Sequence, residues 1–149
     1  KAYGLAGARL GYAMARPEVI RVIDTVAEPF NANRVGLAGA AAVLREDGEA
    51  YVHALEATLE ERGRLTEALH ARGYTVAESR TNFVFFDTGA DATALATRML
   101  ERGVIVRSCA SWGFPAHLRV TVGKPEHTER FLAVLDAAIS ALGKETVYG

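Results

Sequence analysis

The spacing of apolar residues near the end of the chain predicts a helix that packs against a core. Apolar side chains recur there at intervals of three and four residues, which places them on one helical face. Pro125 suits the first position of this helix because its missing N–H needs no partner there, and Gly143 is expected to end it. The apolar positions are Phe131, Val134, Leu135, Ala138, Ile139 and Leu142.

Alternating apolar and polar positions predict strands just before this helix. Residues 118 to 122 alternate in this way, which is typical of a strand buried on one face. Residues 82 to 87 are rich in phenylalanine and valine and are expected to form a second strand. Because residues 118 to 122 alternate, Arg119 should lie on the face of that strand opposite the apolar residues. Shorter strands are expected at 74 to 76 and at 104 to 107.

Two further helices flank the predicted strands. Asp91 is a good N-cap for a helix that runs to Arg102 and is closed by Gly103. A longer helix is expected over residues 49 to 72, where apolar positions form an imperfect stripe, and Gly73 ends it. From residue 49 the order is helix, strands, helix, strands, helix. This order predicts an α/β fold in which a small sheet has helices packed on one face.

The first 45 residues have a different character. They begin glycine-rich, with a short strand expected over residues 10 to 15, and continue with helices expected over 17 to 27 and 33 to 45. Two helices without a strand between them do not complete a layer, so this part is expected to expose apolar surface. We therefore predict two domains: residues 1–47, the end of a larger domain, and residues 48–149, a complete small α/β domain.

Composition excludes several classes of function. The chain has 149 residues, of which 50% are hydrophobic and 23% are charged, as in an ordinary soluble domain. A net charge of -1 gives no electrostatic reason to expect nucleic acid or an anionic membrane as partner. No apolar run approaches the roughly 18 residues that would span a membrane. The single cysteine, Cys109, excludes an internal disulfide and fits a packing role, and the four histidines lack metal-ligand spacing.

The start of the chain carries the strongest chemical signal. Lys1 stands eight residues before Arg9, in a run whose glycines allow the backbone to approach a ligand closely. A lysine near another cation can attack a carbonyl as the neutral amine, and an arginine can grip a phosphate with two hydrogen bonds. This run resembles the cofactor-lysine segment of the fold-type I aminotransferases. In that family the lysine forms a Schiff base with pyridoxal 5'-phosphate, and an arginine eight residues later holds the cofactor phosphate.

Four further segments, in the same order along the chain, resemble the histidinol-phosphate aminotransferases of that fold type. Any one of them is a weak match, but five segments in register cover nearly the whole chain. The resemblance implies a fragment that contains the end of the large cofactor domain and the complete small C-terminal domain. The segments are Pro29-Phe30-Asn31, residues 82 to 87, residues 103 to 108, and Gly113-Phe114-Pro115 leading into residues 118 to 123.

The resemblance implies roles for five residues. Lys1 would be the catalytic residue, which binds the cofactor and shuttles a proton, and Arg9 would hold the cofactor phosphate. Arg119 would clamp the α-carboxylate of glutamate or 2-oxoglutarate, which a planar guanidinium suits better than an ammonium group. Arg107, expected at the end of its strand, would recognise the phosphate of histidinol phosphate. Asn82 would orient the substrate or hold the domain geometry, although a plain turn residue fits its position equally well.

These roles imply an enzyme of histidine biosynthesis. It would transfer an amino group between histidinol phosphate and 2-oxoglutarate, with imidazole-acetol phosphate and glutamate on the other side of the reaction. It would be a cytoplasmic homodimer when full length, with these small molecules and pyridoxal 5'-phosphate as partners, and without nucleic acid, membrane or metal. In the family, the remaining cofactor contacts precede the lysine. We therefore expect this chain to be a fragment that is inactive alone.

Two other functions stay open. A transaminase of the same fold that acts on aromatic amino acids, or a related decarboxylase, would share most of these residues. Arg107 discriminates weakly, because a phosphate needs a cation where an aromatic ring would want an apolar wall. A non-catalytic α/β binding module would leave Lys1, Arg9, Arg107 and Arg119 diverging in space, whereas an enzyme needs all four to face one cleft.

Several nearby residues have more ordinary interpretations. Tyr3 and Tyr12 are interpreted as packing residues that flank the cofactor loop, and for Trp112, near the substrate-side arginines, loop packing is favoured over stacking. Asn31 fits either a helix N-cap or a residue that lines the active site. Glu60 and Glu61 are interpreted as part of a solvated helix face.

Overall fold

A computed structural model describes residues 3–46 and 48–145. The chain forms two compact units, residues 1–55 and 56–149. Helix α3 (Gly48–Ala71) begins in the first unit and ends in the second. The predicted domains 1–47 and 48–149 stay a prediction. None of the described helices is long and apolar enough to cross a membrane.

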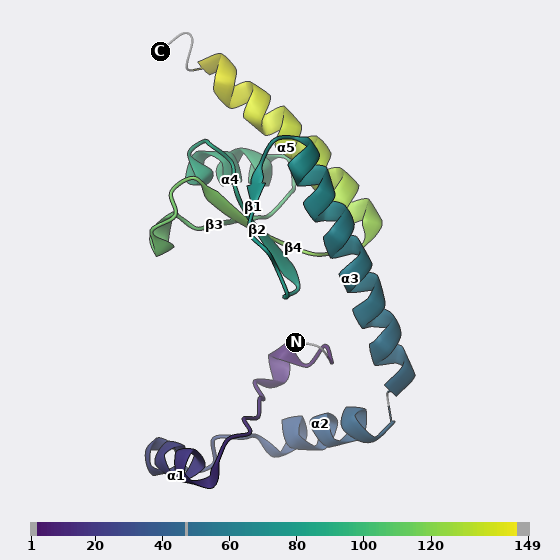
Figure 1. Cartoon of the computed structure of the whole chain (residues 1–149), viewed down its shortest axis with the longest axis vertical. Coiled ribbons are helices and arrows are strands. Elements are labelled where there is room, and N and C mark those ends of the chain that lie inside the picture. The colour runs from purple at the N-terminus through teal and green to yellow at the C-terminus, as the bar shows by residue number, and fades with distance from the viewer. Residues whose placement is uncertain (1–2, 47, 146–149) are drawn as a thin grey trace. The chain divides into compact units, whose positions relative to one another are not determined.

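The first unit consists of helices joined by irregular segments (Figure 1). A one-turn 3-10 helix, η1 (Ala6–Ala8), is followed by α1 (Pro17–Val26) and α2 (Arg34–Glu46), close to the predicted helices. The strand predicted over residues 10 to 15 is wrong, because these residues have no regular secondary structure. A strand must pair its backbone groups with a neighbour, and residues 3–46 contain no second strand that could provide one.

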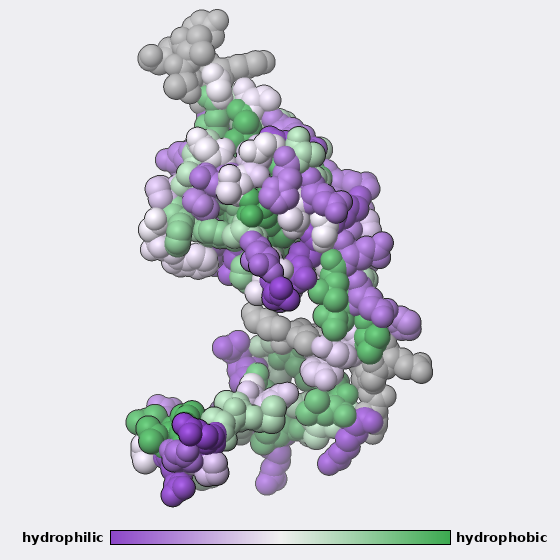
Figure 2. Space-filling view, viewed as in Figure 1, coloured by the Kyte–Doolittle hydropathy of each residue, from purple (hydrophilic) through white to green (hydrophobic). Residues whose placement is uncertain are grey.

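The first unit exposes many large apolar side chains, as expected. Helix α1 has no buried residue, and Phe30, at a positive φ of 60°, is fully exposed. Figure 2 shows this apolar surface in green over α1 and α2. The exposed set includes Val19, Val22, Ile23, Val26, Val35, Leu37 and Leu44.

Asn33, rather than Asn31, caps helix α2. Its Oδ1 accepts a hydrogen bond from the Gly36 N–H at 2.6 Å, the usual N-cap bond to the third helical residue. Its Nδ2 donates to the carbonyl of Ala8 at 3.0 Å, which ties the start of α2 to η1. Gly36 leaves room for this side chain, because a Cβ at that position would lie 2.9 Å from Asn33 Nδ2. The cap therefore also holds the segment that leads into Arg9.

A four-stranded antiparallel sheet forms the centre of the second unit (Figure 1). Strand β2 pairs with β4 along its full length, from Phe83 with Thr121 to Asp87 with His117. The strands at the two edges, β1 and β3, are only two residues long. The strands are β1 (Thr75–Val76), β2 (Phe83–Asp87), β3 (Arg107–Ser108) and β4 (His117–Thr121), in the spatial order β1-β2-β4-β3.

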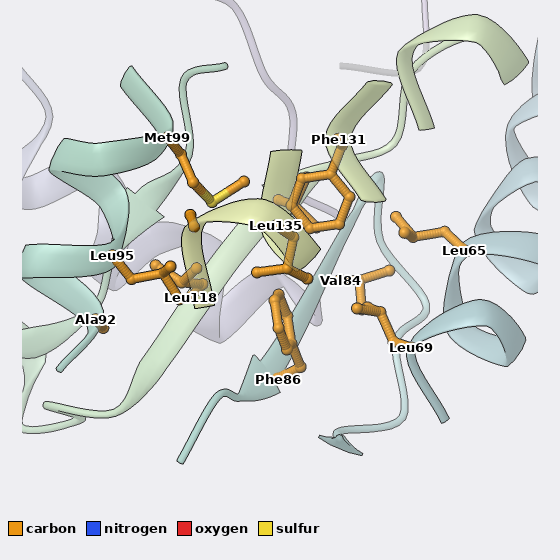
Figure 3. Packing of buried hydrophobic residues seen from close by; sticks show 12 residues of the cluster. Leu65, Leu69, Val84, Phe86, Ala92, Leu95, Met99, Leu118, Phe131 and Leu135 are labelled. Carbon is orange, nitrogen blue, oxygen red and sulfur yellow. The ribbon is translucent and has the colours of Figure 1, made fainter. Parts of the chain in front are cut away.

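Helices cover one face of this sheet, as the sequence predicts. The second half of α3 packs there together with α4 (Ala92–Glu101) and α5 (Pro125–Glu145). Their apolar side chains meet alternate residues of β2 and β4 in one buried cluster (Figure 3). The cluster contains Leu65, Leu69, Val84, Phe86, Ala92, Leu95, Met99, Leu118, Val120, Phe131, Leu135 and Ala138.

Local capping signals set most helix ends of the second unit. Asp91 Oδ1 accepts hydrogen bonds from the N–H groups of Thr93 at 2.8 Å and Ala94 at 2.9 Å, so it caps α4 as predicted. Gly103 follows α4 at a positive φ of 75°, also as predicted. Gly143 does not end α5, which continues to Glu145. A glycine inside a helix costs only about 1 kcal/mol, and the apolar face of α5 outweighs that cost.

Strand β3 begins later than the sequence predicts. The Val104 N–H donates to the carbonyl of Met99 at 2.9 Å, within the chain reversal that follows α4. This N–H is therefore not available to the sheet. Arg107 opens its strand, whereas the sequence places it at the end.

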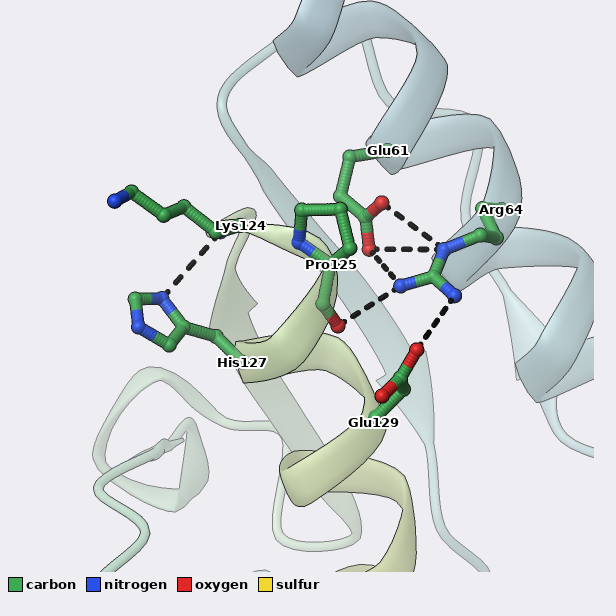
Figure 4. Close-up of polar contacts among 6 residues, drawn as sticks. All are labelled: Glu61, Arg64, Lys124, Pro125, His127 and Glu129. Carbon is green, nitrogen blue, oxygen red and sulfur yellow. Dashed lines mark hydrogen bonds and ion pairs between the residues drawn. The ribbon is translucent and has the colours of Figure 1, made fainter.

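Glu61 corrects the interpretation of Glu60 and Glu61 as a solvated face. Glu61 is only 5% exposed and lies where α3 meets α5 (Figure 4). The Arg64 guanidinium donates to Glu61 Oε1 at 2.9 Å and to the carbonyl of Pro125 at 2.9 Å, so it links the two helices. The hydrogen bond from Arg64 lowers the pKa of Glu61, against the opposing effect of burial.

We expect Glu61 to make the second unit sensitive to acid. Because its folded-state pKa is lowered, the carboxylate stabilises the fold above the ordinary glutamate pKa, and this stabilisation is lost as the pH falls through the folded-state pKa. Glu61→Gln should reduce the free energy of unfolding at pH 7 by about 1 to 2 kcal/mol. It should also flatten the pH dependence below about pH 5. Urea unfolding at several pH values measures both effects.

Glu129→Gln is the matched control for this experiment. The Glu129 carboxylate is 70% exposed and meets the same Arg64 guanidinium only at 3.5 Å. This variant should stay within about 0.5 kcal/mol of the unchanged chain at every pH. If the unchanged chain and Glu61→Gln lost stability equally in acid, a carboxylate other than Glu61 would govern the transition.

Candidate active site

The sheet face opposite the helices carries both arginine and aromatic side chains. Arg119 of β4 belongs to this face, whereas its neighbours Leu118 and Val120 are buried in the core. The prediction that Arg119 lies on the strand face opposite the apolar residues is therefore confirmed. Arg119 pairs in register with Phe85 of β2 and with Arg107 of β3. The two arginines consequently stand directly opposite each other on adjacent strands.

The two arginines form a concentrated positive charge. Cα atoms of directly paired strand residues lie about 5 Å apart, and like charges at such positions repel. Among residues 3–46 and 48–145, no carboxylate forms an ion pair with Arg107 or Arg119. Arg107 is exposed and Arg119 is half-buried, so both guanidinium groups can reach a ligand. An anion bound there would relieve the repulsion between them.

Aromatic rings contact both guanidinium groups. The Cζ atoms of Arg107 and Arg119 lie 5.9 and 5.6 Å from the centroid of the Trp112 ring. Arg119 Cζ also lies 4.9 Å from the centroid of the Phe83 ring. These distances fall within the range of about 6 Å at which a cation is attracted to an aromatic face. The interpretation of Trp112 as a loop-packing residue is therefore wrong, because its ring contacts the two arginines of the site.

A short 3-10 helix, η2 (Ala110–Trp112), fixes the backbone that carries the tryptophan ring. The N–H groups of Trp112 and Phe114 both donate to the carbonyl of Cys109, at 2.9 and 3.2 Å. Gly113 ends this turn at a φ of 85°, a conformation that favours glycine. The chain thus reverses immediately after Trp112 and returns into β4.

Cys109 packs beside the site without a nucleophilic role. Its side chain is fully buried, and burial raises the pKa of the thiol, although the charges of Arg119 and Arg107 oppose this shift. A raised pKa keeps the thiol protonated at neutral pH, and the thiolate is the reactive form. The packing interpretation of this cysteine is supported.

His117 is a neighbour of the site that the sequence pattern did not single out. Its ring stacks on Phe85, with centroids 4.8 Å apart, and meets the edge of Phe114 at 5.3 Å. Its Nδ1 is buried and has no hydrogen-bond partner in the described part of the chain. The alternation along β4 could have indicated this position, because His117 lies two residues before Arg119 and therefore on the same face of the strand. These rings extend the aromatic surface of the face on which Arg119 lies.

Asn82 contributes to the sheet through its backbone. Its carbonyl accepts a hydrogen bond from the Val122 N–H at 2.9 Å, just before β2 begins. The turn that precedes it contains Ser79 and Thr81, whose hydroxyl groups lie 3.0 Å apart. This geometry agrees with the turn-residue alternative, and a substrate role for the Asn82 side chain stays a prediction.

The residues expected on the cofactor side belong to the first unit. Lys1 lies outside the described residues. Arg9 is exposed at a positive φ of 56°, and its Nη1 donates to the carbonyl of Ala6 at 3.4 Å, a long hydrogen bond. No described carboxylate pairs with Arg9. Tyr12 is 80% exposed, so its packing interpretation is wrong within this structure.

The arrangement is suited to binding and orienting anions. Of the predicted site residues, the structure brings Arg107 and Arg119 together on one face of the second unit. The guanidinium groups of Arg9, Arg107 and Arg119 have no carboxylate partner in the described ranges, a property they share with other arginines such as Arg62, Arg102 and Arg130. In the same ranges, no group of three or more His, Cys, Asp or Glu residues could hold a metal ion.

Comparison with known proteins connects this arrangement to a family. The sequence profile of "Aminotransferase class I and II" matches residues 1–135. The chain is 44% identical over 140 residues to the histidinol-phosphate aminotransferase of Symbiobacterium thermophilum, covering 93% of this chain and 38% of that protein. It is 46% identical over 132 residues to the aromatic amino acid aminotransferase of Nocardia farcinica, covering 89% of this chain and 36% of that protein.

A solved structure supports the same family. The histidinol-phosphate aminotransferase of Sinorhizobium meliloti, in complex with pyridoxal-5'-phosphate, superposes with a TM-score of 0.79 at 28% identity, covering 95% of this chain and 39% of that one. The chain therefore spans less than two fifths of the length of these three relatives. It belongs to the class I and II aminotransferase family and has the α/β fold of the fold-type I aminotransferases.

Proposed function

We propose that this chain is the C-terminal portion of a pyridoxal-phosphate-dependent aminotransferase that acts on histidinol phosphate and 2-oxoglutarate. The observation that carries the proposal is the pairing of Arg107 with Arg119 on one sheet face, with no carboxylate partner among the described residues. The reactants carry phosphate and carboxylate groups, the anions that guanidinium groups bind best. The Symbiobacterium thermophilum relative, named histidinol-phosphate aminotransferase, supports this choice of substrate.

Arg119 would bind the α-carboxylate of the glutamate or 2-oxoglutarate co-substrate. It belongs to β4, which lies between the two strands β2 and β3, and its half-buried side chain is on the face opposite the apolar core. A planar guanidinium can donate two parallel hydrogen bonds to a carboxylate, which fixes the orientation of the bound acid. Partial burial would strengthen this charge-assisted pair relative to the same pair in bulk water.

Arg107 would bind the phosphate of histidinol phosphate. It is more exposed than Arg119 and stands on the edge strand, where a bulkier anion has room. The two arginines face each other across β3 and β4 and therefore do not diverge. A binding module with unrelated surface arginines would be expected to have diverging arginines. This pairing supports the enzyme over the non-catalytic binding module for two of the four residues, and a common cleft that also includes Lys1 and Arg9 stays a prediction.

Among the described residues, Arg9 is suited to bind the phosphate group of a cofactor. The exposed Arg9 guanidinium makes only one long hydrogen bond, to a backbone carbonyl, and can therefore donate to a phosphate. Arg9 would hold the phosphate of pyridoxal 5'-phosphate, and Lys1 would bind its aldehyde carbon. When bound, this cofactor supplies an electron sink for the carbon that carries the amino group.

Lys1 would move the proton of the reaction at its Nζ atom. A neutral amine can take a proton from the substrate carbon and return it at another atom, as general base and then general acid. A cation near this amine, such as the guanidinium proposed to hold the cofactor phosphate, would favour its neutral form. The full-length enzyme is proposed to act as a homodimer.

A cofactor-trapping experiment tests the expectation that this chain is inactive alone. The chain is mixed with pyridoxal 5'-phosphate, its visible absorption is followed, and borohydride is added before peptide mapping. We expect no stable absorption band of lysine-bound cofactor, because cofactor contacts outside this sequence would be missing. A stable band, with borohydride fixing the cofactor on Lys1, would contradict that expectation.

Turnover by the full-length parent protein tests the proposed reaction. We expect kcat/KM for histidinol phosphate to exceed that for phenylalanine by at least about tenfold, because Arg107 offers a cation to the phosphate. The Nocardia farcinica relative and the aromatic rings around Arg119 make aromatic amino-acid transamination the second candidate. A preference for phenylalanine would favour that candidate, and activity with neither substrate would overturn the proposal.

A further inference from the structure

Trp112 is the only tryptophan of the chain, and its ring contacts both arginines of the site. Arg119 meets two rings, those of Trp112 and Phe83, while Arg107 meets that of Trp112. A guanidinium group over an aromatic face keeps its hydrogen-bond donors free at its edge. These rings can therefore hold the arginines without occupying the groups that would bind an anion.

The two arginines need such support because their charges repel each other across the strand pair. A carboxylate partner would fix them but would also compete with an anionic ligand. In the described ranges the aromatic rings take the place that an acidic side chain would otherwise have. An attraction between a cation and an exposed aromatic face contributes about 0.5 to 1 kcal/mol.

The backbone that carries the Trp112 ring is held by hydrogen bonds. The η2 turn fixes its backbone by hydrogen bonds to the carbonyl of Cys109, and Gly113 allows the reversal that follows. The turn is also tied to α4, because the Ser108 and Thr93 hydroxyl groups lie 3.0 Å apart and the Ala110 N–H donates to Ser108 Oγ at 3.4 Å. Trp112 is 50% exposed, so it borders the solvent from which a ligand would arrive.

We propose that Trp112 is a positioning residue that holds the guanidinium groups of Arg107 and Arg119 side by side for small ligands that carry carboxylate or phosphate groups. The identity of these ligands rests on the proposed function, whereas the positioning is a property of the chain without ligand. Because one ring contacts both arginines, an anion that draws either guanidinium away changes the surroundings of the ring. Trp112 fluorescence should therefore respond to occupation of either arginine.

The ligand-free chain tests the positioning. The Nε–H signals of Arg107 and Arg119 are compared by NMR in the unchanged chain, Trp112→Ala, Trp112→Phe and the control Phe114→Ala. Phe114 is a suitable control because it lies in the same loop, is 45% exposed, and contacts Phe85 and His117 instead of the arginines. In Trp112→Ala we expect the Arg107 signal to lose its ring-current shift and the Arg119 signal to keep only the part due to Phe83, and both guanidinium groups should become more mobile. Trp112→Phe should preserve most of the effect, and Phe114→Ala should preserve nearly all of it.

Titration with 2-oxoglutarate and with inorganic phosphate tests whether the positioning of the two arginines strengthens the binding of anions. We expect Trp112→Ala to raise the dissociation constant for 2-oxoglutarate about fivefold, or about 1 kcal/mol, at constant ionic strength. Phe114→Ala should change it less than about twofold. Unchanged backbone amide signals in both variants show that the fold is intact.

The outcomes separate this inference from the proposed function. If Arg119→Ala does not weaken 2-oxoglutarate binding, the proposed role of Arg119 fails, and the ligand-free NMR comparison still decides the positioning. If Arg119→Ala weakens binding while Trp112→Ala leaves both binding and the arginine signals unchanged, the inference about Trp112 is wrong and the proposed function stands.

Discussion

Replacing Arg119 by lysine is expected to lower kcat/KM of the full-length parent enzyme for glutamate by about 100-fold, or about 2.7 kcal/mol. Lysine keeps the charge but loses the planar pair of donors that matches a carboxylate. It also loses the flat surface that lies against the rings of Phe83 and Trp112. Steady-state kinetics with varied glutamate measures the effect.

Arg102→Lys is the matched control for the Arg119 substitution. The Arg102 guanidinium donates to the carbonyl of Arg98 within its own helix end and lies away from the sheet face of the site. Its kcat/KM should remain within about twofold of the unchanged enzyme. If Arg119→Lys retained full activity while Arg102→Lys did as well, a carboxylate clamp at Arg119 would be excluded.

Leu135→Ala is expected to destabilise the second unit by about 3 kcal/mol. Leu135 is fully buried and belongs to the cluster between the sheet and the helices (Figure 3). Removing most of its side chain leaves a cavity that neighbouring rings such as Phe86 and Phe131 cannot fill without moving. Urea unfolding followed by the fluorescence of Trp112 measures this unit specifically, because the chain has no other tryptophan.

The comparison for this substitution is Leu100→Ala on helix α4. Leu100 is 56% exposed, so the same chemical change removes a side chain that is already largely in water. Its free energy of unfolding should change by less than about 1 kcal/mol. Equal losses in the two variants would mean that Leu135 contributes through helix propensity rather than through packing.

Elements with local signals could be predicted from the sequence. Asp91 and Gly103 bound their helix as expected, because a cap depends on hydrogen bonds within a few residues. The alternation over residues 118 to 122 gave both a strand and the correct face for Arg119. The same local view failed at residues 10 to 15, because a strand exists only where another strand pairs with it.

The candidate site could be predicted only in part. The resemblance directed attention to Arg107 and Arg119, but their pairing depends on how β3 and β4 align after an intervening loop. Nothing in the local pattern fixes that register. Trp112 was expected near these arginines, but its contact with both of them could not be predicted, since its ring reaches them only through the η2 turn and the reversal at Gly113. The role of Lys1 stays a prediction.

Neighbouring polar residues illustrate the limits of a helix pattern. Glu61 sits in a run of charges that suggests solvent exposure, yet it is buried where α3 crosses the start of α5. Its partner Arg64 lies one turn further along the same helix, a spacing at which helical side chains meet. The contact with Pro125 was not visible, because it joins residues 61 positions apart.

The brevity of β1 and β3 has a consequence for the solution behaviour of the second unit. Each offers only two residues along which a foreign strand could add to the sheet, and β3 begins with a charged side chain. Short and charged borders of this kind discourage lateral growth into fibrillar assemblies. The small sheet is thereby protected against strand addition at its edges, although it is joined through α3 to a segment rich in exposed apolar side chains.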